Sequence, residues 1–173
     1  MNKLTLYLML GYPGAGKTTA AKAIHELTGA VHVSSDKERV ELFSSPSFSQ
    51  HEHDELYEAL DNKTESLLRK GISVIYDANL NRLQHRTDKY DIAERTGAQV
   101  ILVWVKTHKE LAKERAAHTS RLHLWPKHEL PHDMFERIAG LIEEPLKHEP
   151  YVEIDGTKIT AEYMKERLKA HEA

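Results

Sequence analysis

Gly11-Tyr12-Pro13-Gly14-Ala15-Gly16-Lys17-Thr18 lies near the amino end of the 173-residue chain and decides how the rest is interpreted. It fits a pattern of one glycine, four arbitrary residues and then Gly-Lys-Thr. Glycines allow backbone angles that other residues avoid, so successive N–H groups can converge on an anion. The stretch therefore predicts a loop that holds phosphate, between a strand and a helix.

We expect a nucleoside triphosphate to bind this loop and the first turn of the following helix. Lys17 would reach the β- and γ-phosphates, the Thr18 hydroxyl would ligate Mg²⁺, and the helix end would add partial positive charge. The expected binding residues are Gly11, Pro13, Gly14, Ala15, Gly16, Lys17, Thr18 and Thr19. The alternative is an ordinary glycine-rich turn with Lys17 in solvent.

Apolar segments and helical segments alternate along the chain. The expected strands cover residues 4–10, 31–33, 72–76, 100–105 and 151–154. The expected helices cover residues 18–27, 36–43, 51–70, 82–96, 108–118, 133–144 and 160–170, with an irregular segment over 119–131. This alternation predicts an α/β fold, a three-layer sandwich with a parallel sheet covered on both faces. We expect residues 1–173 to form a single domain.

Composition narrows the class of protein. Lys and Arg number 24 against 27 Asp and Glu, a net charge of −3, so there is no overall basic footprint for nucleic acid or anionic membrane. The apolar run over residues 4–10 is too short for a bilayer, which needs ~20 residues. Absence of cysteine excludes thiolate catalysis and Cys-ligated zinc, and fits a cytoplasmic protein. We expect no membrane contact and no obligatory protein partner.

A carboxylate follows the second expected strand. Asp36 lies in Ser34-Ser35-Asp36-Lys37-Glu38-Arg39, and loops that follow parallel strands gather at the edge of the sheet where phosphates bind. Asp36 can therefore accept a proton from an attacking hydroxyl. Arg39, one helical turn onward, can hold an anionic substrate group by paired hydrogen bonds. The alternative is that Asp36 caps the helix, and the sequence leaves both interpretations open.

Asp77 ends the apolar strand over residues 72–76, which is the Walker-B form. Such a carboxylate holds Mg²⁺ directly or through water. The alternative is a turn residue, because Asp-Ala-Asn favours turns. Paired with the upstream loop, Asp77 is the favoured metal ligand together with Thr18.

Arg115 and Arg121 lie just before and just after the start of the polar segment over residues 119–131. Phosphoryl transfer places negative charge on the transferred oxygens, and an arginine that closes over them stabilises it. We expect a helical lid over approximately residues 115–131 that also excludes water. The alternative for Arg115 is an ion pair with Glu110 or Glu114.

Together these segments resemble the polynucleotide-kinase-like and zeta-toxin-like branch of the P-loop kinases, a group of small AAA-type kinases. The matching segments are 11–19, 34–39, 75–86 and 115–121. The resemblance implies five parallel strands in the order 2-3-1-4-5, ATP as the donor, and Asp36 as the base toward the acceptor hydroxyl. It further implies that Arg39 contacts substrate, that Arg82 or Arg86 lies near the substrate cleft, and that lid arginines embrace ATP.

The leading prediction is a kinase that moves the γ-phosphoryl group of Mg-ATP to a hydroxyl. Lys17 would neutralise phosphate charge, Asp36 would receive the proton, and Arg121 or Arg115 would stabilise the transferred group. The acceptor stays open between a small molecule and a nucleic-acid 5′ end. The alternative is a regulatory switch NTPase, which the absence of an Asn-Lys-x-Asp guanine-reading segment disfavours.

Overall fold

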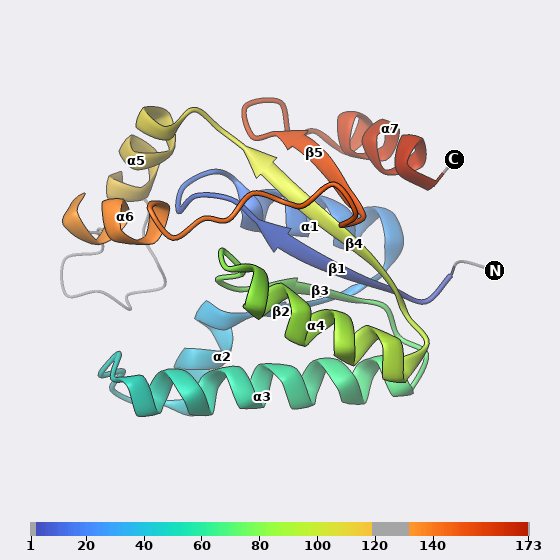
Figure 1. Ribbon diagram of the computed structural model, residues 1–173, viewed down its shortest axis with the longest axis horizontal. Coiled ribbons are helices and arrows are strands. Elements are labelled where there is room, and N and C mark those ends of the chain that lie inside the picture. Colours follow the sequence, from blue (N-terminus) through green and yellow to red (C-terminus); the bar gives the residue numbers. More distant parts are fainter. Residues whose placement is uncertain (1–2, 119–131, 173) are drawn as a thin grey trace.

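The structure is a computed structural model, and it describes residues 3–118 and 132–172. Within these residues, five strands form one parallel sheet in the order β2-β3-β1-β4-β5 (Figure 1). The strands are β1 (Thr5–Leu10), β2 (Val31–Ser34), β3 (Val74–Asp77), β4 (Gln99–Lys106) and β5 (Tyr151–Asp155). The sheet confirms the α/β class and the strand order that the family resemblance implied.

The helices agree with the sequence prediction except at one end. They are α1 (Lys17–Thr28), α2 (Ser35–Leu42), α3 (Gln50–Arg69), α4 (Leu83–Thr96), α5 (Lys109–His118), α6 (His132–Ala139) and α7 (Ala161–Glu172). The prediction that a helix continues to residue 144 is wrong, because α6 ends at Ala139 just before Gly140. Leu141 and Ile142 form turn hydrogen bonds back to the last residues of α6. The Glu143 N–H then donates to the Asn81 carbonyl oxygen, so the chain runs toward the loop that follows β3. The predicted irregular segment over 119–131 lies outside the described residues.

Alternating side chains of β1 build the two halves of the core. Every residue of β1 is buried. Leu6, Leu8 and Leu10 pack with α3 and α4 on one face, whereas Tyr7 and Met9 pack with α1 and α7 on the other. Burial of each such side chain contributes about 1.5–3 kcal/mol, so the central strand is strongly anchored between two layers of helices. This is the expected three-layer arrangement (Figure 1).

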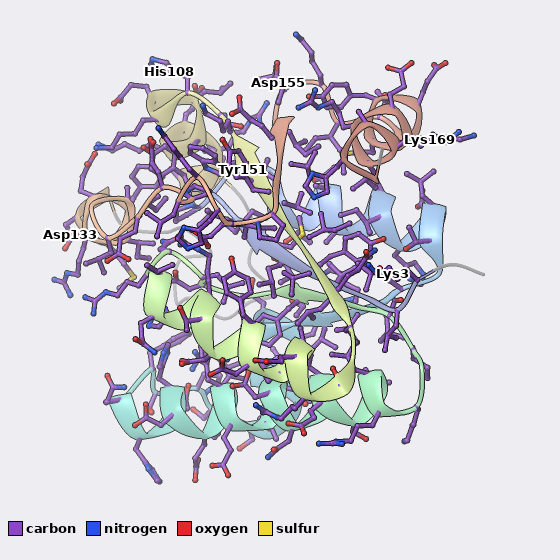
Figure 2. All side chains as sticks on the ribbon, turned by 45° about the vertical axis from the view of Figure 1, so that its right-hand side comes forward. Lys3, His108, Asp133, Tyr151, Asp155 and Lys169 are labelled. Atoms are coloured by element: carbon purple, nitrogen blue, oxygen red, sulfur yellow. The ribbon has the colours of Figure 1, made fainter. Side chains whose placement is uncertain are left out.

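The parallel order brings the loops after the strands to one edge of the sheet. His108, which follows β4, and Asp155, which ends β5, lie at the top of Figure 2, far from Lys3, which precedes β1. Candidate functional residues after β1, β2 and β3 belong to the same edge. In the described part of the chain, no helix combines the length and apolar character that a membrane crossing needs.

Candidate active site

The loop between β1 and α1 has the geometry of a phosphate cradle. Gly11 and Gly14 have φ values of 149° and 76°, in the region that favours glycine. A Cβ on Gly11 would lie 2.5 Å from the Val105 carbonyl oxygen, and one on Gly14 would lie 2.1 Å from the Ala112 carbonyl oxygen. The loop is therefore pressed against the end of β4 and against α5, where only glycine fits.

Lys17 places its ammonium group over this loop. Its Nζ donates hydrogen bonds of 2.9 Å to the carbonyl oxygens of Gly11 and Tyr12. Gly16 precedes the helix as its N-cap with a positive φ, so the N-terminus of α1 begins directly at the loop. The cation, the glycine-rich backbone and the helix end are thus brought together as the sequence predicted.

Thr18 and Asp77 meet across the gap between α1 and β3. The Thr18 hydroxyl donates to Asp77 Oδ2 at 2.9 Å. Nε2 of His32 lies 2.9 Å from the same oxygen, and because a carboxylate only accepts, Nε2 carries the proton of this bond. The two predicted metal ligands are adjacent, and a histidine that sequence reasoning missed holds one of them.

Asp77 is kept ionised by its surroundings. Burial disfavours the charged carboxylate, but the hydrogen bond from His32, the charge of Lys17 and the bond from Thr18 outweigh burial and lower the pKa of Asp77 below its usual value. The signal for His32 was a single polar residue in the apolar stretch Val31-His32-Val33. Strand register places Ser34 beside Asp77, and His32 shares the face of Ser34 because it lies two residues earlier.

The donor set of this site fits Mg²⁺ bound together with a nucleotide. Across residues 3–118 and 132–172, no group of three or more His, Asp or Glu side chains could hold a metal ion by itself. Thr18 and Asp77 supply a hydroxyl and a carboxylate oxygen 2.9 Å apart. Mg²⁺ is commonly bound by one or two protein oxygens, with water and phosphate completing its octahedron. The pair therefore suits an ion that arrives with phosphate.

Asp36 lies in the first turn of α2 and is only partly buried. The N-cap of α2 is Ser34, so the alternative that Asp36 serves as the cap is wrong. Among the described residues, the Asp36 carboxylate forms no hydrogen bond or ion pair. Its charge helps to raise the pKa of Tyr57 to about 12, although burial is the main cause and Arg39 opposes it. Asp36 thus follows the strand that pairs with the metal-site strand, and its carboxylate has no partner among the described residues.

Arg39 makes a structural contact in this structure, and its expected contact with substrate stays a prediction. It is buried, forms an ion pair with Glu52, and its guanidinium carbon lies 4.7 Å from the centre of the Phe48 ring. Glu52 also accepts from the backbone N–H and hydroxyl of Ser47. Arg39 therefore fastens the loop between α2 and α3.

The two arginines near β3 differ in their surroundings. Arg86 is fully buried, and its Nε and Nη2 donate to the two oxygens of Glu149 at 2.7 and 3.0 Å. Its Nη1 donates to the carbonyls of Leu80 and Asn81. The prediction that Arg86 contacts substrate is therefore wrong. Arg82 is exposed at the N-cap of α4 and keeps its place as a candidate.

Arg115 stands beside the phosphate cradle. Its Nη1 donates to the Gly156 carbonyl at 3.1 Å. A Cβ on Gly156 would lie 2.2 Å from the Ala15 carbonyl oxygen, to which the Thr107 hydroxyl also donates at 2.8 Å. The turn after β5 therefore forms a wall of the cradle. Arg121, the other predicted lid arginine, lies outside the described residues.

Comparison of the sequence with known proteins shows the family to which the chain belongs. A family model described as an AAA domain matches residues 6–145. The 2′,3′-cyclic-nucleotide 3′-phosphodiesterase of Mus musculus is 33% identical over 106 residues, and the match covers 60% of this chain. It spans only 24% of the length of that protein.

Solved structures agree with the fold. A Chloroflexus aurantiacus protein described provisionally as a kinase superposes with a TM-score of 0.77 at 18% identity, covering 98% of this chain and 99% of that one. The Mycobacterium tuberculosis APS kinase CysC, solved in complex with AMPPNP and APS, gives a TM-score of 0.66 at 17% identity, covering 99% and 98%. At these identities the likeness concerns the fold. The chain belongs to the AAA domain family and has the fold of the P-loop kinases.

Proposed function

We propose that this protein is a kinase that transfers the γ-phosphoryl group of ATP to a hydroxyl of a small molecule or of a nucleic-acid 5′ end. The observation that carries the proposal is the carboxylate of Asp36, which has no partner in residues 3–118 and 132–172 and lies two residues beyond the point where Ser34 pairs with Asp77. A regulatory switch needs no proton acceptor at this place. We further propose that residues 1–173 act as one catalytic domain.

The residues divide the work of phosphoryl transfer. Thr18 and Asp77 would hold Mg²⁺ together with the nucleotide, and the bound ion would supply positive charge to the phosphate oxygens. Lys17 and the loop amides orient the phosphates, and Arg115 adds charge from the side of α5. Asp36 takes the proton of the acceptor hydroxyl while the oxygen of that hydroxyl forms a bond to the γ-phosphorus. The bond from that phosphorus to the β–γ bridging oxygen breaks, and ADP leaves with the electron pair.

ATP is the proposed donor for two reasons. The APS kinase that shares this fold was solved with AMPPNP, an ATP analogue. In this chain the turn after β5, around Asp155–Thr157, lies against the cradle and offers a wall for adenine. Asp155 accepts from the N–H and the hydroxyl of Thr157, which fixes this turn.

Replacement of Asp36 by Asn tests the proposal. We expect phosphoryl transfer to fall by roughly 10²–10⁴-fold, while the affinity for Mg-ATP stays nearly unchanged. Transfer is followed with γ-labelled ATP against a panel of hydroxyl compounds and 5′-hydroxyl oligonucleotides, with Lys17→Ala as the blank, and affinity is followed by calorimetry. Equal loss of binding and transfer would make Asp36 structural. Release of free phosphate alone across the whole panel would favour the switch.

A further inference from the structure

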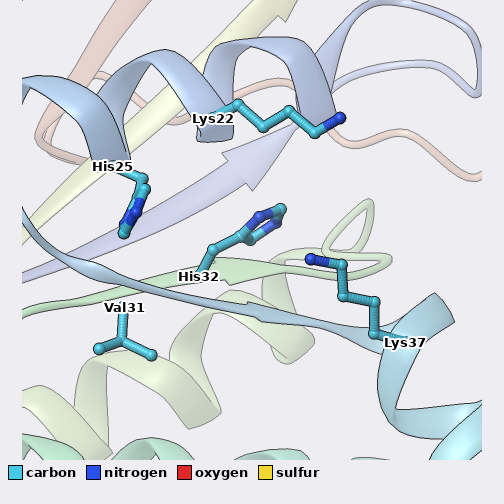
Figure 3. A pocket seen from close by; sticks show the side chains of 5 residues that line it. All are labelled: Lys22, His25, Val31, His32 and Lys37. Carbon is cyan, nitrogen blue, oxygen red and sulfur yellow. The ribbon is translucent and has the colours of Figure 1, made fainter.

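A basic hollow lies on the outer flank of the sheet, between α1, β2 and α2. It has a volume of about 350 Å³ and is lined by Lys22, His25, Val31, His32 and Lys37. Figure 3 shows Lys22 and His25 on the α1 side, Lys37 on the α2 side, and the His32 ring between them. Four of the five lining side chains are basic and the fifth is apolar, so the wall carries no carboxylate.

The hollow adjoins the candidate metal site. Thr18, Lys22 and His25 are spaced four and three residues apart on α1, so they share one face of that helix. His32 lines the hollow and also bonds Asp77 Oδ2, the oxygen that accepts from Thr18. An occupant of the hollow would therefore lie next to the residues that hold metal and nucleotide.

The two lysines of the hollow are exposed, and among the described residues neither forms an ion pair or a side-chain hydrogen bond. A second hollow provides a contrast. Its lining residues are Leu27, Ala161, Glu162, Lys165, Glu166 and Lys169. There two lysines are accompanied by two glutamates, whereas Lys22 and Lys37 have no nearby acidic partner in the wall. The Asp77 carboxylate behind His32 is already bonded by Thr18 and His32, so the open side of the hollow presents the two lysines to an anion.

We propose that this basic hollow holds a phosphate group carried by the acceptor. Ammonium groups that approach from opposite walls suit an anion with several oxygens, and charge-assisted hydrogen bonds to phosphate are strong. The phosphates of ATP, the proposed donor, would occupy the Gly11–Thr18 loop and not this hollow. Asp36, the proposed base, and Lys37 lie in the same turn of α2 and point to different sides of it, so an acceptor that reaches Asp36 needs to extend only around this turn to place a phosphate in the hollow. This inference rests on the proposed kinase function and narrows its substrate to hydroxyl compounds that already carry a phosphate.

Direct binding is tested with inorganic phosphate on protein saturated with Mg-AMPPNP, which occupies the cradle. The imidazole NMR signals of His25 and His32 report on the hollow itself. We expect a saturable shift in the wild type, with affinity at least about tenfold weaker in the Lys22→Ala/Lys37→Ala double variant. The matched control Lys165→Ala/Lys169→Ala removes the same charge from the second hollow and should bind phosphate like the wild type. Equal affinity in all three proteins, or no shift, overturns the proposal.

Kinetics test whether the phosphate belongs to the acceptor. Hydroxyl acceptors are compared in pairs that differ only by one phosphate group. We expect the double variant to raise KM for the phosphorylated member at least about tenfold, with kcat and the KM for ATP unchanged. Transfer that shows no preference for the phosphorylated member overturns the proposal. Phosphate binding in the hollow without transfer to any acceptor would instead overturn the kinase function and leave the anion site supported.

Discussion

The side chains of this site differ in the hydrogen bonds and ion pairs that they form. Asp77 Oδ2 is shared by Thr18 and His32, and no described side chain bonds its second oxygen, Oδ1. Asp36 has an uncommitted carboxylate, whereas Arg39 and Arg86 are bound by glutamates. Among the described residues, the glutamate contacts thus separate Arg39 and Arg86, which hold the fold, from Asp36, to which the mechanism assigns the proton.

Replacement of His32 by Ala should weaken magnesium-dependent nucleotide binding. Without this hydrogen bond the carboxylate of Asp77 loses its orientation, and loss of a group that orients a metal ligand typically costs 10–100-fold in metal affinity. A titration of MgCl₂ at fixed ATP, followed by nucleotide fluorescence, measures the shift. His32→Gln keeps an N–H donor and should recover part of the affinity. If the alanine variant lowers only the melting temperature, His32 is merely structural.

Among the helices, α4 depends on charged contacts at both of its ends. Near its start, Arg86 bonds Glu149 from the segment before β5, and both side chains are buried. Near its end, Arg95 bonds Glu65 of α3, which also accepts from Arg69. The Arg86–Glu149 pair is buried, whereas the Arg95–Glu65 pair is partly exposed. We therefore expect mutation of the two pairs to change the free energy of unfolding by different amounts.

Glu149→Ala should be strongly destabilising. It leaves the Arg86 guanidinium buried without a counter-charge, which costs about 3–5 kcal/mol of unfolding free energy. Urea unfolding at neutral pH provides the measurement. The control is Glu153→Ala, which breaks the exposed pair with Lys106 and should cost less than ~1 kcal/mol. Similar losses in the two variants would show that the Arg86 contact is no stronger than a surface pair.

Glu65→Gln should lower stability in a pH-dependent manner. The hydrogen bonds from Arg95 and then from Arg69 lower the pKa of Glu65 to about 2, from a usual value of 4.5. A lowered folded-state pKa gives stability that is fully present above pH 4.5 and is lost as the pH falls toward 2. Urea midpoints of both proteins at several pH values should therefore differ at neutral pH and converge on acidification. A constant difference would refute the ionic origin.

These elements also show what the sequence can and cannot predict. Local patterns such as the Gly11–Thr18 loop and the apolar run of β1 are complete within one segment, so they predict the glycine-rich turn between strand and helix and the α/β class. The strand order came from the family resemblance, and the sheet confirms it. The metal role of Asp77 stays a prediction. The burial of Arg86 depends on Glu149, far along the chain, and no local pattern records that pairing. The position of His32 beside Asp77 depends on strand register in the same way. The end of α6 at Ala139 was missed although Gly140 marks it.

At the scale of the whole molecule, the phosphate cradle is enclosed by segments distant in sequence. Val105 belongs to β4 and Thr107 follows it, Ala112 belongs to α5, and Gly156 belongs to the turn after β5. The sheet order makes this possible, because β4 lies between β1 and β5. The shape of the cradle is thus a property of the assembled sheet.

Gly156→Ala should impair the cradle without touching its motif. The added methyl would lie 2.0 Å from Thr107 Oγ1 and 2.2 Å from the Ala15 carbonyl oxygen, so the loop or the turn must move. A displacement of about 1 Å can cost on the order of 10²-fold in transfer rate. Transfer assays and ATP calorimetry measure the loss. Gly140→Ala, whose methyl would lie 3.2 Å from the Glu136 carbonyl oxygen, should leave transfer unchanged, and equal loss in both would contradict the steric argument.

The enclosure of the loop at Ala15 by Thr107 and Gly156 also bears on how the protein is made. A ribosome releases the Gly11–Thr18 stretch early, but the side walls that shape it emerge only with β4 and β5. A nascent polypeptide stalled between these strands carries every residue of the motif without the surface that would grip a triphosphate. We therefore expect a nascent chain to bind nucleotide only after the last strand has emerged.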